Sequence, residues 1–412
     1  MILNGRDYVK IQEAARILGV TEQTLRNWDR RGKLATQRHP VNGYRIYRVA
    51  EIHELLRTAS SEQVSFEFDT ASRTRPDLPD LPPCHWSPEV ALDPKHRPQH
   101  WDRTSSTVRR DWRKFPQEAH VIDRTGTRYR RLTVDEIAVL QGFDPSVARL
   151  DGLTERERIA ALGDSVPPPL AKAVVSSICE VWKCRNRTAI EICAGIGGLA
   201  EGASTVGLDH ALLVDHWEVS GRLLRNGRHW RPDRVQVGDA REIAWSAYAD
   251  KVGLLSGGPP CQPWSQSGNR LGHSDERDLL GRINEVVAAV RPEVFLFENV
   301  PGLGSGSQNG EYLRQLVLRL RRPAEGLRYG VLVAQFNAAD FGVPQNRERL
   351  FILGLRDSPA SLAARCFDLV ERKKTHKRLG SRNGPSRPSW VTVGEAISTM
   401  PDPGGWRRWI GV

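Results

Sequence analysis

Cys261 lies in a conformationally restricted stretch of the sequence, GGPPCQPWSQSG (257–268), directly after the apolar run VGLLS. A proline precedes the thiol and a Gln-Pro pair follows it, so the backbone on both sides has few accessible conformations. A buried structural cysteine does not need such restriction, whereas a nucleophile must be held at one angle to its target. The stretch therefore predicts a reactive thiol at the end of a strand.

A glycine-rich turn further upstream predicts a cofactor site. The turn follows the apolar strand pattern TAIEIC, opens the helical pattern LAEGASTVG, and comprises Ala194, Gly195, Ile196, Gly197 and Gly198. Asp215 ends the next predicted strand about 20 residues later, where an acid commonly binds the two ribose hydroxyls of a nucleotide. The simpler interpretation is a glycine turn that only packs a helix, with Asp215 exposed to solvent.

Two further residues favour an adenosine-containing cofactor. Trp217 follows Asp215 closely and offers a ring on which adenine could stack. Asp239 ends the third predicted strand, where its carboxylate could accept a hydrogen bond from the adenine amino group. These residues do not distinguish NAD from S-adenosylmethionine.

Three motifs then occur in order: Pro-Cys-Gln at 260–262, Glu-Asn-Val at 298–300 and QNRER at 345–349. In this order, behind a glycine turn, they resemble the cytosine-C5 DNA methyltransferase family, over roughly residues 130–355. The resemblance implies S-adenosylmethionine as the methyl donor and double-stranded DNA as the substrate. It also implies catalytic roles for Cys261, Glu298, Arg347 and Arg349.

The chemistry of the reaction explains these residue types. Cytosine C5 is a poor nucleophile, and addition of a thiolate to C6 moves electron density onto it. Cys261 is the expected thiolate. Glu298 is expected to relieve charge at N3, and Arg349 to stabilise charge at O2. Arg347 is expected to support thiol addition and to contact nearby phosphates. The sequence does not identify the base that removes the C5 proton.

The resemblance also implies a full set of cofactor and DNA contacts. The cofactor set is the turn 194–198 with Asp215 or His216, Trp217, Asp239, Ala240, Pro259, Leu280, Ser165 and Val166. A stacked cytosine must leave the duplex before it can react. The polar, glycine-containing stretch 265–280 suits a loop that closes over DNA, with Ser265, Gln266 and Ser267 filling the vacated stack and Arg277 binding a phosphate.

The order of motifs differs from that of the family. An RxLT helix, Arg131 to Phe143, and a GDSVP loop (163–167) precede the catalytic motifs, whereas in the family they follow them. A circular permutation explains this order, with WKCRNR (182–187) as the connector, since the family's last helix packs beside its first strand. Asp164 replaces the family's Asn, and Cys193 replaces an aromatic residue.

The family's target-recognition region is reduced in this chain. The segment WVTVGEAISTMPDPGG near the C-terminus resembles its entrance, and HWDRTSSTVRR (100–110) resembles its exit. Residues 59–100, the N-terminal module or a partner subunit could supply recognition. The basic run 372–387 is expected to lie along DNA phosphates, or alternatively to be a solvated loop.

The N-terminus reads as a helix–turn–helix module over residues 8–57. A helix with Ile11, Ala14 and Leu18 at helical spacing is followed by a second helix, TEQTLRNWDRRG, and by a hairpin at Asn42-Gly43. The module resembles winged MerR-like and excisionase-like domains. Its predicted DNA contacts are Gln23, Thr24, Arg26, Asn27 and, on the wing, Arg45. A protein-docking or dimerising helix pair is the alternative.

Composition supports an intracellular protein that binds a polyanion. The chain has 412 residues, a net charge of +11 and a sequence pI of about 9.6. The six cysteines are scattered, so neither a zinc site nor a disulfide framework is expected. The sequence MILNGRDYVK lacks the apolar core of a signal peptide. We expect a prokaryotic, cytoplasmic, nucleoid-associated protein.

The predicted fold is a doubly wound α/β methyltransferase sheet preceded by a small winged helix–turn–helix domain. We expect the domain boundaries to be 1–58 for the helix–turn–helix module, 59–129 for a linker and partial target-recognition region, 130–183 for the permuted motifs, 184–360 for the catalytic domain and 361–412 for a basic tail. The leading functional hypothesis is a DNA cytosine-C5 methyltransferase in restriction–modification or phage defence. The alternatives are a DNA-binding regulator with a vestigial enzyme domain and an RNA cytosine-C5 methyltransferase.

Overall fold

The computed structural model divides the chain into two compact units, Met1–Asp80 and Leu81–Val412. The residues that it describes are 8–11, 14, 29, 34, 36–38, 45–48, 51, 98–112, 116–183, 185–226, 229–260, 279–378 and 386–408. No helix among these residues is long and apolar enough to cross a membrane.

The first unit contains a three-stranded antiparallel sheet in the order β1-β3-β2. Its strands are β1 (Tyr8–Lys10), β2 (Gln37–Arg38) and β3 (Arg45–Arg48). The pairing of β2 with β3 agrees with the predicted wing. We did not predict β1, whose residues we had assigned to the start of the first helix. Tyr47 on β3 and Ala14 are fully buried and form part of the core.

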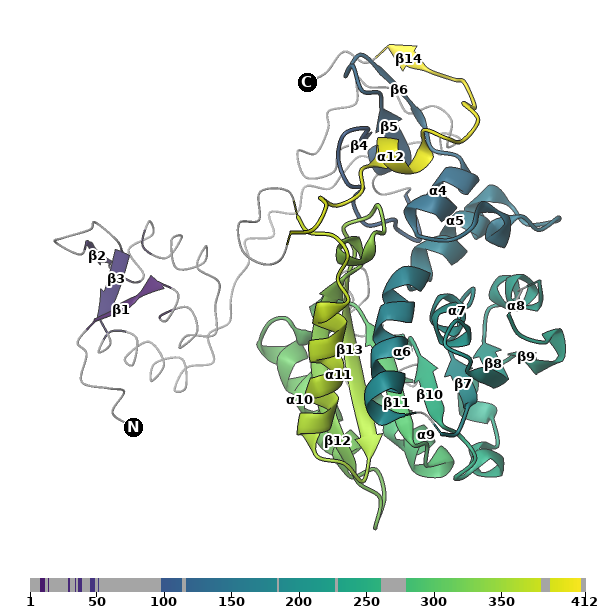
Figure 1. Ribbon diagram of the computed structural model, residues 1–412, viewed down its shortest axis with the longest axis vertical. Coiled ribbons are helices and arrows are strands. Elements are labelled where there is room, and N and C mark those ends of the chain that lie inside the picture. Colours follow the sequence, from purple (N-terminus) through teal and green to yellow (C-terminus); the bar gives the residue numbers. More distant parts are fainter. Residues whose placement is uncertain are drawn as a thin grey trace, which may run out of the picture. The chain divides into compact units, whose positions relative to one another are not determined.

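A seven-stranded sheet forms the centre of the second unit (Figure 1). Its order is β12-β13-β11-β10-β7-β8-β9, with β9, β8, β7, β10 and β11 parallel and β13 antiparallel to both of its neighbours. The strands are β7 (Thr188–Ile192), β8 (Asp209–Asp215), β9 (Val235–Val237), β10 (Leu254–Gly257), β11 (Val294–Asn299), β12 (Tyr329–Asn337) and β13 (Glu348–Arg356). The predicted α/β fold is confirmed.

Helices cover both faces of this sheet, which explains why strands such as VFLFEN are buried throughout. On one face pack α6 (Pro168–Trp182), α7 (Gly198–Ser204) and α11 (Ala360–Arg372). The other face is covered by α9 (Ile283–Val290) and α10 (Ser307–Arg321). The helix α8 (Glu218–Arg225) contacts β8 and β9. Because the parallel strands run the same way, β7, β8, β10 and β11 end at one edge.

A smaller four-stranded sheet, in the order β14-β6-β5-β4, joins two segments that are far apart in the sequence. It consists of β4 (Gln99–His100), β5 (His120–Ile122), β6 (Arg128–Arg131) and β14 (Arg407–Arg408). The helices α4 (Val134–Leu140), α5 (Glu155–Asp164) and α12 (Val393–Ile397) lie beside it in Figure 1 and share its apolar core. The segments that resemble the two ends of a recognition region therefore meet in one lobe.

Local sequence signals explain the boundaries of several helices. Thr133 caps α4, within the predicted RxLT helix, and forms a capping box with Glu136. Thr154 and Glu157 form another capping box at the start of α5. The predicted GDSVP loop (163–167) is shorter than expected, because α5 continues to Asp164 and only Ser165 to Pro167 separate it from α6. The three consecutive prolines set the start of α6, as expected.

Two other expectations were wrong. Residues 98–110, which we had assigned to a linker and partial target-recognition region, are not a free linker, because they contain β4 and Val108 belongs to a buried cluster. The expected basic tail instead begins with α11, whose Cys366 and Phe367 are buried against the sheet. Residues 59–97 lie outside the described residues, and the finer domain boundaries remain predictions.

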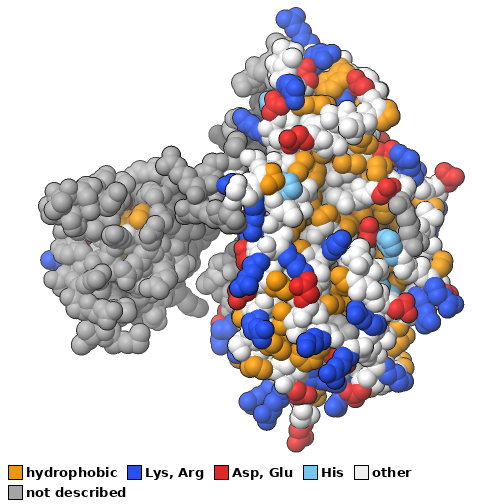
Figure 2. Space-filling view, in the orientation of Figure 1, with side chains coloured by type: hydrophobic (Ala, Val, Ile, Leu, Met, Phe, Trp, Pro, Cys, Tyr) orange, Lys and Arg blue, Asp and Glu red, His pale blue; other side chains and the backbone are white. Residues whose placement is uncertain are grey.

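The surface charge of the second unit is mixed on the face seen in Figure 2. Blue Lys and Arg side chains are spread over this face and alternate with red acidic ones, so its charge is not gathered in one patch. Within the basic run 372–387, Lys373 pairs with Glu180 and Lys374 with Asp340. These two lysines therefore have carboxylate partners within the protein, and the expected phosphate contacts of the run remain a prediction.

Candidate active site

Glu298 and Arg349 form an ion pair at the edge where the parallel strands end. Glu298 is near the end of β11 and Arg349 near the start of β13, and these strands are antiparallel neighbours. Arg349 Nε lies 2.6 Å from Glu298 Oε1, and both side chains are about nine-tenths buried. Burial raises the pKa of Glu298, while the Arg349 charge opposes this effect. The site therefore combines an acid that retains its proton more readily than usual with a fixed cation.

The start of the Pro-Cys-Gln loop lies directly beside this pair. The amide of Asn299 donates a 3.0 Å hydrogen bond to the carbonyl of Pro259. A Cβ built on Gly258 would lie 3.1 Å from Glu298 Oε2. The chain thus leaves β10 next to the Glu298 carboxylate. The predicted nucleophile and DNA contacts that follow, Cys261, Ser265, Gln266, Ser267 and Arg277, lie outside the described residues.

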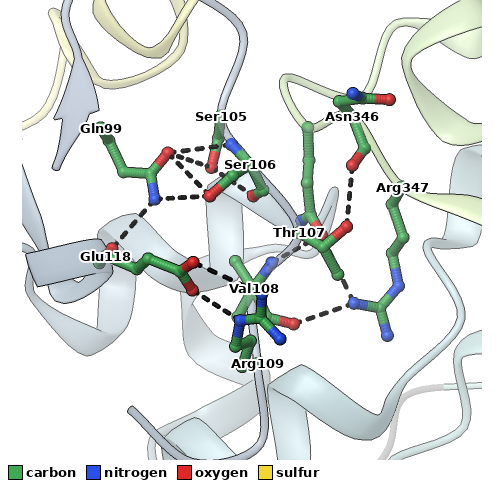
Figure 3. A network of polar contacts seen from close by, with 10 residues as sticks. Gln99, Ser105, Ser106, Thr107, Val108, Arg109, Glu118, Asn346 and Arg347 are labelled. Carbon is green, nitrogen blue, oxygen red and sulfur yellow. Dashed lines mark hydrogen bonds and ion pairs between the residues drawn. The ribbon is translucent and has the colours of Figure 1, made fainter. Parts of the chain in front are cut away.

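Arg347 does not occupy the position that we expected. Its side chain is fully buried. The Arg347 guanidinium points into the protein and donates a 3.0 Å hydrogen bond to the Val108 carbonyl (Figure 3). It also donates 2.6 Å to the Gly163 carbonyl and 2.9 Å to the Ser165 carbonyl. A guanidinium held in this way cannot contact a phosphate, so that part of the expectation is wrong.

The side-chain carboxylate of Asp215 holds the glycine turn in place by accepting hydrogen bonds from backbone N–H groups. Its carboxylate accepts a 2.8 Å hydrogen bond from the Gly195 N–H and a 2.9 Å bond from the Trp217 N–H. Asp215 is only 7% exposed, whereas the side chain of His216 is 78% exposed. Of the two candidates for a ribose contact, His216 is therefore the one whose side chain is accessible.

The junction between α5 and α6, residues 163–167, packs against the glycine turn. A Cβ on Gly198 would lie only 2.0 Å from the Val166 carbonyl oxygen, so the two backbones are in direct contact. Ser165 Oγ is buried and has no hydrogen-bond partner within the described residues. The two segments that the sequence assigned to one cofactor are thus adjacent. The unpaired hydroxyl beside Gly195 fits a polar ligand there.

The remaining cofactor candidates occupy different environments. Trp217 is half-buried, and the Arg110 guanidinium lies 4.8 Å from its ring centroid. Asp239 caps the short helix η4 (Ala240–Glu242) and pairs with Arg241, whose hydrogen bonds lower the pKa of that carboxyl. Ala240 and Leu280 are buried in the same core cluster, where they support the strand ends.

A cavity of about 320 Å³ lies near the turn but shares only Ile196 with the candidate set. Its other lining residues include Asp144, Arg149, Glu201, His229 and Trp230. It is therefore distinct from the predicted cofactor site. Among the described residues, no group of three or more His, Cys, Asp or Glu side chains could hold a metal ion.

Sequence reasoning missed residues whose role depends on tertiary contact. Arg110 pairs with Asp164, the residue that departs from the family pattern. Gln345 accepts a 2.9 Å bond from the Val108 N–H and donates to the Leu140 carbonyl. Neither partner could be deduced from spacing, although an acid where the family has an amide was a signal to look for a new cation. The predicted helix–turn–helix contacts Gln23, Thr24, Arg26 and Asn27 lie outside the described residues, while Arg45 lies on β3.

Comparison with known proteins identifies relatives of both units. The sequence model of the family described as C-5 cytosine-specific DNA methylase matches residues 187–391, and that of the MerR family regulatory proteins matches residues 10–47. The Type II methyltransferase M.AquIA of Picosynechococcus is 31% identical over 231 residues, 52% of this chain and 88% of that protein. The Type II methyltransferase M.PspPI of Psychrobacter is 36% identical over 187 residues, 44% of this chain and 43% of that protein.

Coverage of these relatives is partial. The chain spans about half the length of most of the curated relatives that it matches first. The solved structure of the S. pombe Dnmt2 methyltransferase is 22% identical and matches with a TM-score of 0.31, over 41% of this chain and 49% of that chain. Membership of the family rests on the sequence matches.

Proposed function

Because the chain belongs to the C-5 cytosine-specific DNA methylase family, we propose that it transfers a methyl group to C5 of cytosine in double-stranded DNA. The observation that carries the proposal is the buried Glu298–Arg349 pair, 2.6 Å apart, beside the start of the Pro-Cys-Gln loop. An acid and a guanidinium at one point can bind the N3 and O2 edge of a pyrimidine together.

The residues of this chain divide the chemistry between them. Cys261 adds as a thiolate to C6 of the cytosine, and electron density moves to C5. Glu298 places a proton at N3, which its raised pKa favours, and Arg349 stabilises negative charge at O2. S-adenosylmethionine, when bound, supplies the methyl group. After loss of the C5 proton the C6–S bond breaks, and Cys261 returns to its starting state.

The glycine turn and the α5–α6 junction would hold the methyl donor. Gly195 and Ser165 lie close together, and the buried, unpaired Ser165 hydroxyl would gain a hydrogen-bond partner from a polar group of the ligand bound there. His216 is available for the ribose hydroxyls and Trp217 for the adenine. These contacts bind and orient the donor at the same sheet edge as Glu298.

The MerR-like unit is proposed to contact the DNA duplex, since a helix–turn–helix suits the major groove. A circular permutation accounts for α4, α5 and α6 preceding β7 in the chain. The recognition lobe that contains β6 and β14 is small, so either the MerR-like unit or a partner subunit would complete target recognition. The relatives named as Type II methyltransferases favour a restriction–modification setting.

A methyl-transfer assay with tritiated S-adenosylmethionine tests this function. Wild-type protein is expected to label duplex DNA, and Cys261→Ser to abolish the label. Cys179→Ser is the matched control, because this thiol lies on α6 and outside the site. Label on RNA alone would assign the RNA methyltransferase alternative. Absence of label on both nucleic acids, with the protein folded and bound to DNA, would favour the regulator and refute the proposal.

A further inference from the structure

The α5–α6 junction is held from two sides by arginines that are remote in the sequence. Arg347, at the edge of the catalytic strand β13, donates from one nitrogen to the carbonyls of Gly163 and Ser165, at 2.6 and 2.9 Å. Arg110 pairs with the carboxylate of Asp164, the residue between them. Successive residues of the junction are therefore fixed alternately through their backbone and through a side chain.

The segment that carries Arg110 is itself tied to the catalytic strand. Residues 105–110, which we call the strap, run beside residues 345–347 (Figure 3). The Asn346 N–H donates 2.8 Å to the Ser105 carbonyl, and Thr107 Oγ1 donates 2.8 Å to the Asn346 carbonyl. Arg347 also donates to the Val108 carbonyl. The strap, the junction and the entrance to β13 thus form one connected unit.

Close backbone contact strengthens this connection. A Cβ on Gly163 would lie 2.6 Å from the backbone of Arg109 and Arg110, so only glycine allows the strap to approach α5. Beyond Asp164, the Arg110 guanidinium continues to the face of Trp217, 4.8 Å from the ring centroid. Arg110 therefore links the junction to the residue proposed to stack on adenine.

We propose that Arg110 and Arg347 are positioning residues for the methyl donor, which they serve by fixing the α5–α6 junction and Trp217. The inference rests on the proposed function. Neither arginine acts on the cytosine. Arg347 holds Ser165 and Val166 against the glycine turn, and Arg110 fixes Asp164 and the indole of Trp217 in one arrangement. This role replaces the contact with phosphates expected of Arg347.

Arg110 provides the sharper test because its side chain is 56% exposed, so its removal should not unfold the protein. In Arg110→Met, we expect the Kd for S-adenosylhomocysteine, measured by isothermal titration calorimetry, to rise about three- to tenfold, as an exposed ion pair and a cation–π contact are lost. The KM for S-adenosylmethionine should rise in parallel, with kcat at saturation within about twofold.

Arg314→Met is the matched control. Arg314 is 59% exposed and paired with Glu311 on α10, outside the site. Its removal should leave the Kd unchanged. Asp164→Asn retains an acceptor for Arg110 and should have a smaller effect than Arg110→Met. The double variant should bind no more weakly than Arg110→Met alone, since Arg110→Met already removes the contact that Asp164→Asn only weakens.

Arg347→Lys tests the buried side of the junction. The compact ammonium of lysine cannot donate to three carbonyls as the planar guanidinium does, so the Kd for S-adenosylhomocysteine should rise about tenfold or more. If this variant fails to fold, Arg110→Met and Asp164→Asn still decide the question. Equal Kd values for wild type, Arg110→Met and Arg314→Met would overturn the inference while leaving the proposed function intact. A wild-type protein that binds no S-adenosylhomocysteine would refute both.

Discussion

Replacing Gly198 by alanine tests whether the glycine turn and the α5–α6 junction form one tightly packed site. The added Cβ would lie 2.0 Å from the Val166 carbonyl oxygen, whereas ordinary contacts begin at 3.4 Å. Relief of this contact would require a shift of about 1.4 Å, and the obstacle is backbone that leads straight into Pro167 and Pro168. The junction can therefore yield only by moving away from the turn.

The expected cost follows from two opposing effects. Overpacking costs about 1–3 kcal/mol, and the better helix propensity of alanine offsets about 0.5–1 kcal/mol of this. We expect a net loss of about 1–2 kcal/mol, which lowers the Tm by a few degrees at about 2–4 °C per kcal/mol. The displaced Ser165 and Val166 should also weaken binding of S-adenosylhomocysteine.

Gly310→Ala is the control, because it is the same substitution but its expected effect on stability has the opposite sign. Gly310 lies in α10, and the nearest atom to its added Cβ is 4.0 Å away. The substitution should stabilise by about 0.5–1 kcal/mol through helix propensity. Calorimetric Tm values for both variants decide the matter. If Gly198→Ala were as stable as Gly310→Ala and bound the ligand normally, the packing argument would be refuted.

Three other predictions concern burial and charge. Glu136→Ala leaves Arg130 buried without its 2.6 Å partner and should lower the free energy of unfolding, measured by chemical denaturation, by about 3–5 kcal/mol. Glu311→Ala, which removes an ion pair that is more than half exposed, should lower it by under about 1 kcal/mol. Equal losses of stability would contradict this prediction. Burial lowers the pKa of His120 and His210 from 6.5 to about 4. The stability that this neutral state contributes above pH 6.5 should therefore be lost as the pH falls towards 4, by up to about 3 kcal/mol for each group. A free energy of unfolding in urea that does not change over this pH range would argue against it. Glu298→Gln keeps the shape of the side chain but removes the acidic proton, so kcat should fall about 10²–10⁴-fold while the affinity for S-adenosylhomocysteine stays unchanged. A kcat within tenfold of the wild-type value would show that Glu298 is not the acid.

The sequence predicted the fold wherever the local pattern was strong. The apolar run TAIEIC before the glycine turn located a strand of the large sheet, and the RxLT motif located a helix that the structure confirms as α4. Residues 98–110 were misassigned because their order depends on partners more than two hundred positions away, such as Gln345. The same reason hid α11, whose apolar positions acquire meaning only against α6 and β12.

The candidate site, like the fold, could be predicted from the sequence only in part. The pairing of Glu298 with Arg349 follows from adjacent strands and was implied by the motifs. The burial of Arg347 was not, because a pattern of two arginines two residues apart does not show which one faces inward. Arg349 lies on β13 but Arg347 precedes it, so the alternation of strand side chains does not fix how the two arginines point relative to each other. Only the position of the α5–α6 junction directs Arg347 towards the carbonyls.

The most direct test of the account is covalent trapping on DNA that carries 5-fluorocytosine at the methylated site. Without a C5 proton the methylated base cannot eliminate, so the bond between C6 and the Cys261 sulfur should persist. We predict, by mass spectrometry under denaturing conditions with S-adenosylmethionine present, a protein–DNA adduct for the wild type and none for Cys261→Ser. A wild-type complex that dissociates completely in denaturant, or an adduct that survives the loss of Cys261, would contradict the central claim.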